Sequence, residues 1–354
     1  MEPAADRLYS KLTRSDIPGL DGIRAVSVSA VVLGHLPLRY SAAAQGVSAF
    51  FVLSGFLITT LMLREKQKTG TLSVRKFYIR RALRLLPAFY TFWALYIVLD
   101  RVFQHGHPWT EYLAAALYYL NYYVIIFHPT NVAMAHTWSL AVEEQFYLIW
   151  PWAFLFFSRS TKTLARFLVV TIISVWVYRF ILFRMGATPD RIDLAFDSRA
   201  DQLAVGCLLA VILASARARL VISRFSGHGL SILAIAAAAA SIGLAWRFSF
   251  AYTSPFGLAV DGLVTALIIT QAIACSDMLP WRLLETRPMK YVGRISYGVY
   301  LYHWIGDKAV ITLVAKYGWA AEIVTAFALA IGAATLSYYL IERRAAKYKL
   351  RFKT

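Results

Sequence analysis

Charged residues are scarce in this chain of 354 residues. Only 16% are Asp, Glu, Lys or Arg, whereas a soluble domain carries about 25%. Apolar residues make up 59% of the chain, and they recur in runs of about 17 to 23 residues. Each run is long enough to cross the ~30 Å hydrocarbon core of a bilayer as a helix. The composition excludes a soluble globular protein and predicts an all-α, polytopic membrane bundle.

Cysteine is nearly absent, and so is any targeting signal that would be removed. Cys207 and Cys275 fall inside separate apolar runs, without the close pairing of zinc or redox motifs. We therefore expect two core residues and no metal. The first residues, "MEPAADRLYSKLTRSDIPGLDG", lack the basic-then-apolar order of a cleaved signal peptide, so we expect them to be retained.

Acidic residues are outnumbered, with 19 Asp and Glu against 37 Lys and Arg, and the formal net charge is +18. The basic residues gather at the ends of apolar runs, as they do in cytoplasmic loops. This distribution points to membrane topology and anionic lipids as the reason for the charge, and it argues against nucleic acid as a partner.

Eleven apolar runs are candidates for membrane spans. They lie near 22–40, 46–63, 85–100, 111–128, 138–157, 164–185, 202–214, 229–246, 256–275, 293–314 and 319–341. Basic loops at 64–84, 159–166, 216–224 and 281–294, with the basic tail, are predicted to be cytoplasmic, and the acidic loop "TPDRIDLAFDSRAD" is predicted to be outside.

An odd number of crossings cannot join two cytoplasmic loops, yet three apolar runs separate the loop ending at Arg84 from the one starting at Arg159. One run must therefore not cross, unless the charge rule fails for one loop. The run 111–128 is the best candidate because its "LYYLNYY" is rich in tyrosine, which suits an interface or a protein-lined cavity. We expect ten crossings, one re-entrant or interfacial segment and both termini in the cytoplasm.

Arg24 and His35 are polar residues inside the first apolar run. Eleven residues of helix bring them within about 20° of one face, roughly 16 Å apart along the axis. An ionisable residue in a span is a functional candidate by default. The alternative is that Arg24 reaches lipid phosphate and that His35 bonds to a neighbouring helix.

Two further clusters carry charge. Arg80, Arg81 and Arg84 stand where the basic loop becomes apolar, and arginine makes bidentate contacts with phosphate; such a cluster can also serve only as a topology anchor. Glu143 and Glu144 are adjacent, so on a helix they point about 100° apart. We assign Glu143 to the site because a buried carboxylate can orient an imidazole.

Other polar and aromatic residues could line an acceptor cavity, although loop solvation and aromatic packing explain them as well. These candidates are Trp138, Ser139, Glu144, Asp197, Arg199, Asp201, Tyr297, Tyr300 and His303.

Six segments taken together resemble the acyltransferase-3 family of integral membrane acyltransferases, over about residues 18–342. In order, they are "GLDGIRAVSVSAVVLGH", "GVSAFFVLSGFLITTLM", "FYIRRALRLLPAFY", "TWSLAVEEQFYLIWP", "DSRADQLAVGCLLA" and "RISYGVYLYHW". Residues 1–17 and 343–354 are then cytoplasmic tails that flank this domain.

The resemblance implies an O-acyltransferase in the bacterial cytoplasmic membrane. Such an enzyme moves an acyl group, commonly acetyl, from cytoplasmic acyl-coenzyme A to a hydroxyl of a glycan or other acceptor at the outer side. His35 matches the catalytic histidine and Glu143 the glutamate of the Trp-Ser-Leu motif. Arg24, Arg80, Arg81 and Arg84 match residues thought to meet the donor. His35 is expected to act as a general base or to be acylated itself.

This chain departs from the family pattern at two places. Ser48 and Ala49 replace an aspartate and an apolar residue, which puts a carboxylate role there in doubt. The chain also stops soon after the last span, so we expect no fused esterase-like domain. Transfer is then direct, or a separate extracytoplasmic partner or a second copy of the chain takes part. The competing hypothesis is a transporter or flippase of a lipid-linked glycan.

Overall fold

The computed structural model describes residues 4–14, 16–36, 42–104, 106–314 and 317–349. These residues form helices and connecting segments, with no strand among them. Ten helices in the described parts have 16 residues or more: α2 (Leu20–His35), α3 (Ala43–Thr69), α4 (Val74–Val102), α7 (Trp138–Phe157), α8 (Thr161–Arg184), α10 (Phe196–Ala214), α12 (His228–Phe248), α14 (Leu258–Ala274), α16 (Ser296–Val314) and α17 (Trp319–Ser337).

Six helices of the described chain are each long and apolar enough to cross a membrane, and a seventh span results if Pro189–Ala214 and α11 (Ala216–Phe225) are counted as one bent pair. This confirms a multi-pass helical membrane protein. Ten crossings and cytoplasmic termini stay predictions. The run 111–128 folds as α5 (Trp109–Ala116) and α6 (Leu120–Phe127). Eight residues rise only about 12 Å, so neither helix can cross.

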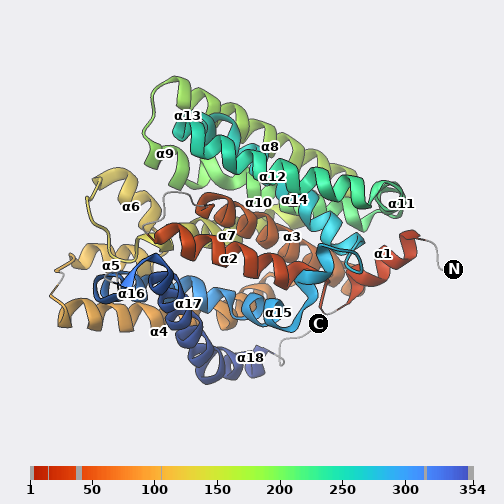
Figure 1. Ribbon diagram of the computed structural model, residues 1–354. Helices are drawn as coiled ribbons and strands as arrows, with labels where there is room; N and C mark the ends of the chain where they lie inside the picture. Colours follow the sequence, from red (N-terminus) through yellow and green to blue (C-terminus); the bar gives the residue numbers. More distant parts are fainter. Residues whose placement is uncertain (1–3, 15, 37–41, 105, 315–316, 350–354) are drawn as a thin grey trace.

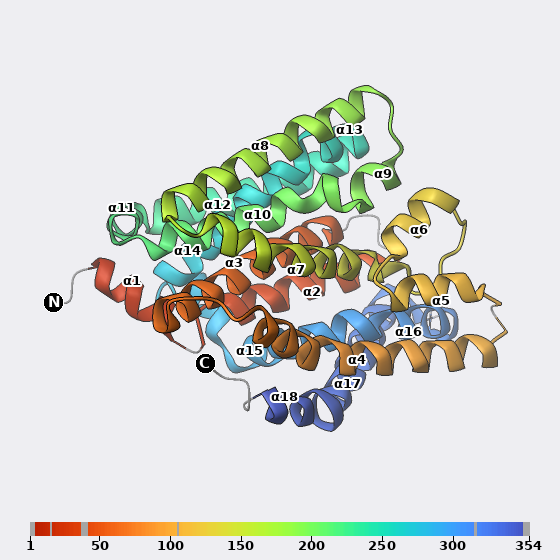
Figure 2. The ribbon, with the colours of Figure 1, turned by 180° about the vertical axis from the view of Figure 1, so that it is seen from behind.

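The helices form three tiers in the ribbon views. Helices α8, α10, α12 and α14 lie along one side, α2, α3 and α7 lie in the middle, and α4, α16 and α17 lie along the other side (Figures 1 and 2). Helices α1 (Ala4–Thr13) and α11 lie at one end of the bundle, whereas α6 and α9 (Pro189–Leu194) lie at the other. Two of the segments predicted to be cytoplasmic, α1 and α11, thus lie at the same end.

Helix α1 is held against the bundle by polar contacts. The Lys11 ammonium donates to the Asp277 carboxylate over 2.9 Å and to the Ser276 hydroxyl over 2.8 Å. The bond from Lys11 lowers the pKa of Asp277, which lies outside the spanning helices. The short helices α15 (Arg287–Arg294) and α18 (Arg343–Lys349) pack beside α2 and α4.

Helices α3 and α10 cross at two glycines in the middle of the bundle. A Cβ at Gly55 would collide with the Leu203 carbonyl, and a Cβ at Gly206 would collide with the Val52 carbonyl and lie 2.7 Å from the Phe56 nitrogen. Small residues allow such close backbone approach in membranes. The crossing fixes the position of α3, and the neighbouring residue Ser54 therefore points away from α10.

We expect Gly206→Ala to destabilise the protein by about 1–3 kcal/mol, because the added methyl forces the two backbones apart. Thermal unfolding in one detergent measures the effect. Gly243→Ala is the matched control, since nothing lies within 4 Å of that position on α12. Equal unfolding temperatures for the two variants would refute the close crossing.

Candidate functional site

A cavity of about 430 Å³ opens between the middle tier and α4 and α16. Five arginines line it, against three carboxylates: Arg24, Arg64, Arg81, Arg84 and Arg294 face Asp16, Asp21 and Glu143. Helices α2, α3, α4, α7, α15 and α16 all contribute side chains. The excess of guanidinium groups suits a ligand with several negative charges.

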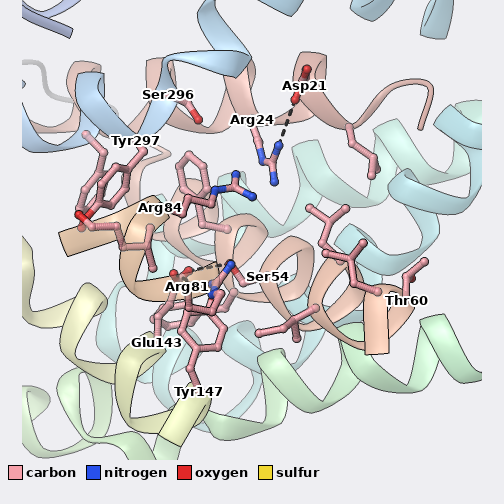
Figure 3. A pocket seen from close by; sticks show the side chains of 18 of the residues that line it. Asp21, Arg24, Ser54, Thr60, Arg81, Arg84, Glu143, Tyr147, Ser296 and Tyr297 are labelled. Carbon is pink, nitrogen blue, oxygen red and sulfur yellow. Dashed lines mark hydrogen bonds and ion pairs between the residues drawn. The ribbon is translucent and has the colours of Figure 1, made fainter. Parts of the chain in front are cut away.

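One wall of the cavity is a connected set of polar groups (Figure 3). The Ser54 hydroxyl donates to Glu143 Oε1 over 2.9 Å, and the Tyr147 hydroxyl donates to Oε2 over 3.2 Å. The guanidinium of Arg81 stacks on the Tyr147 ring, 3.7 Å from its centre. This stacking holds the Arg81 guanidinium at the cavity wall, where its Nε is buried without a hydrogen-bond partner among the described residues.

Arg24 and Arg84 face the opposite part of the same space (Figure 3). Arg24 donates to the Asp21 carboxylate, one turn earlier on α2, over 3.0 Å. Arg84 has no hydrogen-bond or ion-pair partner among the described residues. It is therefore available to a ligand without breaking an internal bond.

The structure separates Arg80 from the other two arginines of its cluster. Arg80 pairs with the Glu65 carboxylate over 2.5 Å, and it does not line the cavity. Glu65 also accepts a bond from the Ser73 backbone nitrogen, 3.0 Å away. The pair therefore connects the end of α3 to the start of α4. Arg80 thus helps to position the helix that carries Arg81 and Arg84.

His35 lies outside the cavity lining, in a second cluster of aromatic rings. Its ring centre is 4.8 Å from that of His303 and 5.2 Å from that of Trp304. His136 completes the cluster, 5.1 Å from His303 and 5.2 Å from Trp304. Among the described residues, no group of metal-ligating side chains has the arrangement of a metal site.

Backbone contacts define the tautomers of two histidines. His35 Nδ1 lies 2.8 Å from the Val31 carbonyl, and His303 Nδ1 lies 2.7 Å from the Tyr300 carbonyl. A carbonyl only accepts, so Nδ1 carries the proton in both rings and Nε2 keeps a lone pair. His35 is half-buried, which leaves its Nε2 free to accept a proton or to attack a carbonyl carbon.

Sequence reasoning gave His136 and Trp304 no role. Both ring nitrogens of His136, Nε2 of His303 and Nε1 of Trp304 are buried without a hydrogen-bond partner in the described part of the chain. Such orphaned groups are unusual in protein interiors. The available signal was the position of His136, two residues before Trp138 in the "HTWSLAVEEQ" segment.

The predicted acceptor residues divide into groups. Ser139, Tyr297 and Tyr300 line the cavity, and His303 belongs to the histidine cluster. Trp138 and Phe51 flank the buried Arg199, whose guanidinium carbon is 5.5 and 5.3 Å from their ring centres. Glu144 does not line the cavity.

Asp201 and Asp197 instead pair with arginines of their own neighbourhood. Asp201 accepts two bonds from Arg179, at 3.0 and 2.9 Å, and one from the Trp176 indole at 2.7 Å. Asp197 accepts from Arg191 at 2.8 and 2.6 Å. Asp201 is 1% exposed and Arg179 0%, so this pair is buried inside the bundle.

Together, the helical bundle and the apolar spans define a multi-pass membrane protein with an arginine-lined cavity close to buried histidines. A family model described as an acyltransferase domain matches residues 17–342. The chain belongs to the acyltransferase-3 family, as its motifs indicate.

Curated relatives match most of this chain. The peptidoglycan O-acetyltransferase OatA of Listeria monocytogenes is 32% identical over 317 residues, covering 83% of this chain and 50% of the relative. The putative peptidoglycan O-acetyltransferase YrhL of Bacillus subtilis is 32% identical over 311 residues, covering 81% and 48%. The O-acetyltransferase OatA of Staphylococcus aureus is 29% identical over 315 residues, covering 84% and 52%.

The chain spans about half the length of the curated relatives it matches. No solved structure matches it.

Proposed function

We propose that the protein is a membrane O-acetyltransferase that takes acetyl from cytoplasmic acetyl-coenzyme A and transfers it to a glycan hydroxyl at the outer side. The observation that carries the proposal is the arginine-lined cavity, whose Tyr300 lies near the ring cluster that contains His35. Relatives named as peptidoglycan O-acetyltransferases support the reaction class and a glycan acceptor. They do not favour the alternative of a glycan transporter.

The cavity offers positions for both ends of the donor. Arg24, Arg81 and Arg84 would bind its phosphate groups, because guanidinium forks match phosphate oxygens. The remaining arm would carry the thioester toward Tyr300 and the histidine cluster. The excess of positive charge also attracts an anionic donor before it docks.

In this mechanism His35 acts as a general base. Its Nε2 takes the proton of the acceptor hydroxyl while the oxygen adds to the thioester carbonyl carbon. When the carbon–sulfur bond breaks, the leaving sulfur takes this proton, so the products are the acetyl ester and free coenzyme A. Mass spectrometry of protein incubated with donor alone tests this step. Detection of acetylated His35 would show that His35 acts as a covalent nucleophile and not as a general base.

A vesicle experiment tests the function. Purified protein in proteoliposomes receives radiolabelled acetyl-coenzyme A on one side and peptidoglycan glycan strands on the other. We expect ester-linked label on the glycan only with donor at the cytoplasmic end of the protein. Movement of glycan across the membrane without acetylation would instead support a transporter.

Arg84 provides the sharpest test of donor binding. We expect Arg84→Ala to weaken acetyl-coenzyme A binding about 10- to 100-fold, since a hydrogen bond to a charged group contributes about 1.5–3 kcal/mol. The fold should persist because Arg84 has no internal ion pair or hydrogen bond among the described residues. Titration calorimetry on purified protein measures the affinity.

Arg75→Ala is the charge-matched control on the same helix, because Arg75 is exposed and does not line the cavity. Its affinity for acetyl-coenzyme A should stay within about twofold of the unmodified protein, allowing for screened surface charge. Equal affinities for the two variants would contradict the placement of the donor phosphates at Arg84.

A further inference from the structure

Two hydroxyl groups meet at the end of the cavity that faces the histidine cluster. Ser139 on α7 and Tyr300 on α16 are 161 positions apart in the sequence, yet their oxygens are 2.5 Å apart. Both residues line the cavity, and both are almost buried, at 4% and 6% exposure. The pair is therefore built into the wall and is not a surface contact.

The direction of each hydrogen bond follows from the third member of the chain. The Tyr300 hydroxyl lies 2.6 Å from the His136 carbonyl, which can only accept, so Tyr300 donates there. The Ser139 hydroxyl lies 3.3 Å from the same carbonyl and 2.5 Å from the Tyr300 oxygen, so in the shorter contact Ser139 donates to Tyr300. Hydroxyl hydrogens turn about a single bond, so both donors can turn toward a stronger acceptor that enters the cavity.

Tyr300 also belongs to the neighbourhood of His35. Its ring centre is 5.6 Å from that of His136 and 5.7 Å from that of His303, which in turn lies 4.8 Å from His35. Tyr300 thus belongs both to the cavity wall and to the surroundings of the histidine cluster that contains the proposed general base.

We propose that Ser139 and Tyr300 bind the carbonyl oxygen of the acyl thioester and stabilise the negative charge it gains during transfer. The inference rests on the proposed function and assigns two catalytic residues to it. The acceptor oxygen forms a bond to the carbonyl carbon, its proton moves to His35 Nε2, and the carbonyl oxygen becomes an oxyanion held by both O–H groups. The carbonyl re-forms as the carbon–sulfur bond breaks, and the sulfur takes the proton from His35.

The helical architecture explains why side-chain hydroxyls serve this purpose. Oxyanion sites need donors aimed at the place where charge develops. Backbone N–H groups in a membrane bundle are mostly engaged within their own helices. Ser139 and Tyr300 differ from three other cavity hydroxyls in their contact with His136: Ser54 and Tyr147 donate to Glu143, and Tyr297 donates to the Leu85 carbonyl.

The test measures thiol release from acetyl-coenzyme A by the full chain in nanodiscs, with peptidoglycan glycan strands as acceptor. We expect Tyr300→Phe and Ser139→Ala each to lower kcat by about 10²- to 10³-fold, which is the cost of losing one oxyanion donor. The Kd for acetyl-coenzyme A should stay near that of the unmodified protein, because the charge on the oxygen exists only in the transition state.

Tyr302→Phe is the matched control, since Tyr302 is equally buried on the same helix but does not line the cavity. It should keep the kcat of the unmodified protein. If Tyr300→Phe and Ser139→Ala both stay within twofold of that kcat, the inference is overturned while the proposed function stands. If the unmodified protein releases no thiol, the proposed function itself fails. Thermal unfolding of each variant separates catalytic loss from misfolding.

Discussion

Replacing His35 by alanine is expected to lower the rate of acetyl transfer by about 10²- to 10⁴-fold, the usual contribution of a general base. The variant removes the Nε2 lone pair, which the Nδ1 bond to Val31 leaves free in the native ring. Donor binding should persist because His35 does not line the arginine cavity. Transfer of labelled acetyl to glycan measures the rate, and calorimetry with acetyl-coenzyme A measures binding.

His228→Ala is the control for losing an imidazole, because His228 is exposed at the start of α12. It should transfer acetyl at the native rate. A His35→Ala protein that keeps more than about a tenth of the native rate would exclude His35 as the base, since even a weak general base contributes about 10²-fold. Loss of donor binding in this variant would instead show that the donor contacts both the cavity and the histidine cluster.

Hydropathy predicted the long helices well, because a segment that crosses the hydrocarbon core needs apolar side chains and satisfies its backbone hydrogen bonds as a helix. The predicted span 138–157 coincides with α7, and 164–185 differs from α8 by a few residues. Hydropathy did not predict where an apolar run breaks. The turn between α5 and α6 includes Tyr118 with a φ of 52°, a local conformation that apolar composition does not encode.

Hydropathy also did not predict the polar ends of helices. Helix α3 continues to Thr69, past the predicted end near residue 63, and its last turns are polar. Glu65 in this extension is buried and bonded to Arg80. The ion pair with Arg80 on α4 thus accompanies the polar extension of α3, and it directs Arg80 away from the cavity. Residue spacing within α4 alone could not predict this pairing with α3.

The candidate site was predicted as a set of residues, but not as a cavity with a separate cluster of rings. Helix geometry placed Arg24 and His35 on one face, and the structure puts Arg24 in the cavity and His35 in the ring cluster. Glu143 bonds to Ser54 and Tyr147, and its described contacts do not include His35. The sequence could not show that Tyr300 contacts both the cavity and the histidine cluster, because its neighbours come from α7 and η1 (Ala135–Thr137).

Asp201→Ala is expected to destabilise the folded protein by about 3–5 kcal/mol, which is the cost of leaving a buried charge without its partner. The Arg179 side chain is fully buried, and Asp201 accepts two of its hydrogen bonds. Thermal unfolding of the purified protein in one detergent measures the loss. This outcome would make Asp201 a structural residue, in place of the acceptor role that its position in "DSRAD" indicated.

Asp197, four residues earlier, is the matched control. Its carboxylate is 44% exposed and pairs with a partly exposed Arg191, so Asp197→Ala should cost less than about 1 kcal/mol. Similar losses for the two aspartates would contradict the distinction between a buried and an exposed pair. The double variant Arg179→Met, Asp201→Leu should recover most of the stability, because removing both charges leaves neither one buried alone. Acetyl transfer by that double variant would then show whether this pair has any part in acceptor binding.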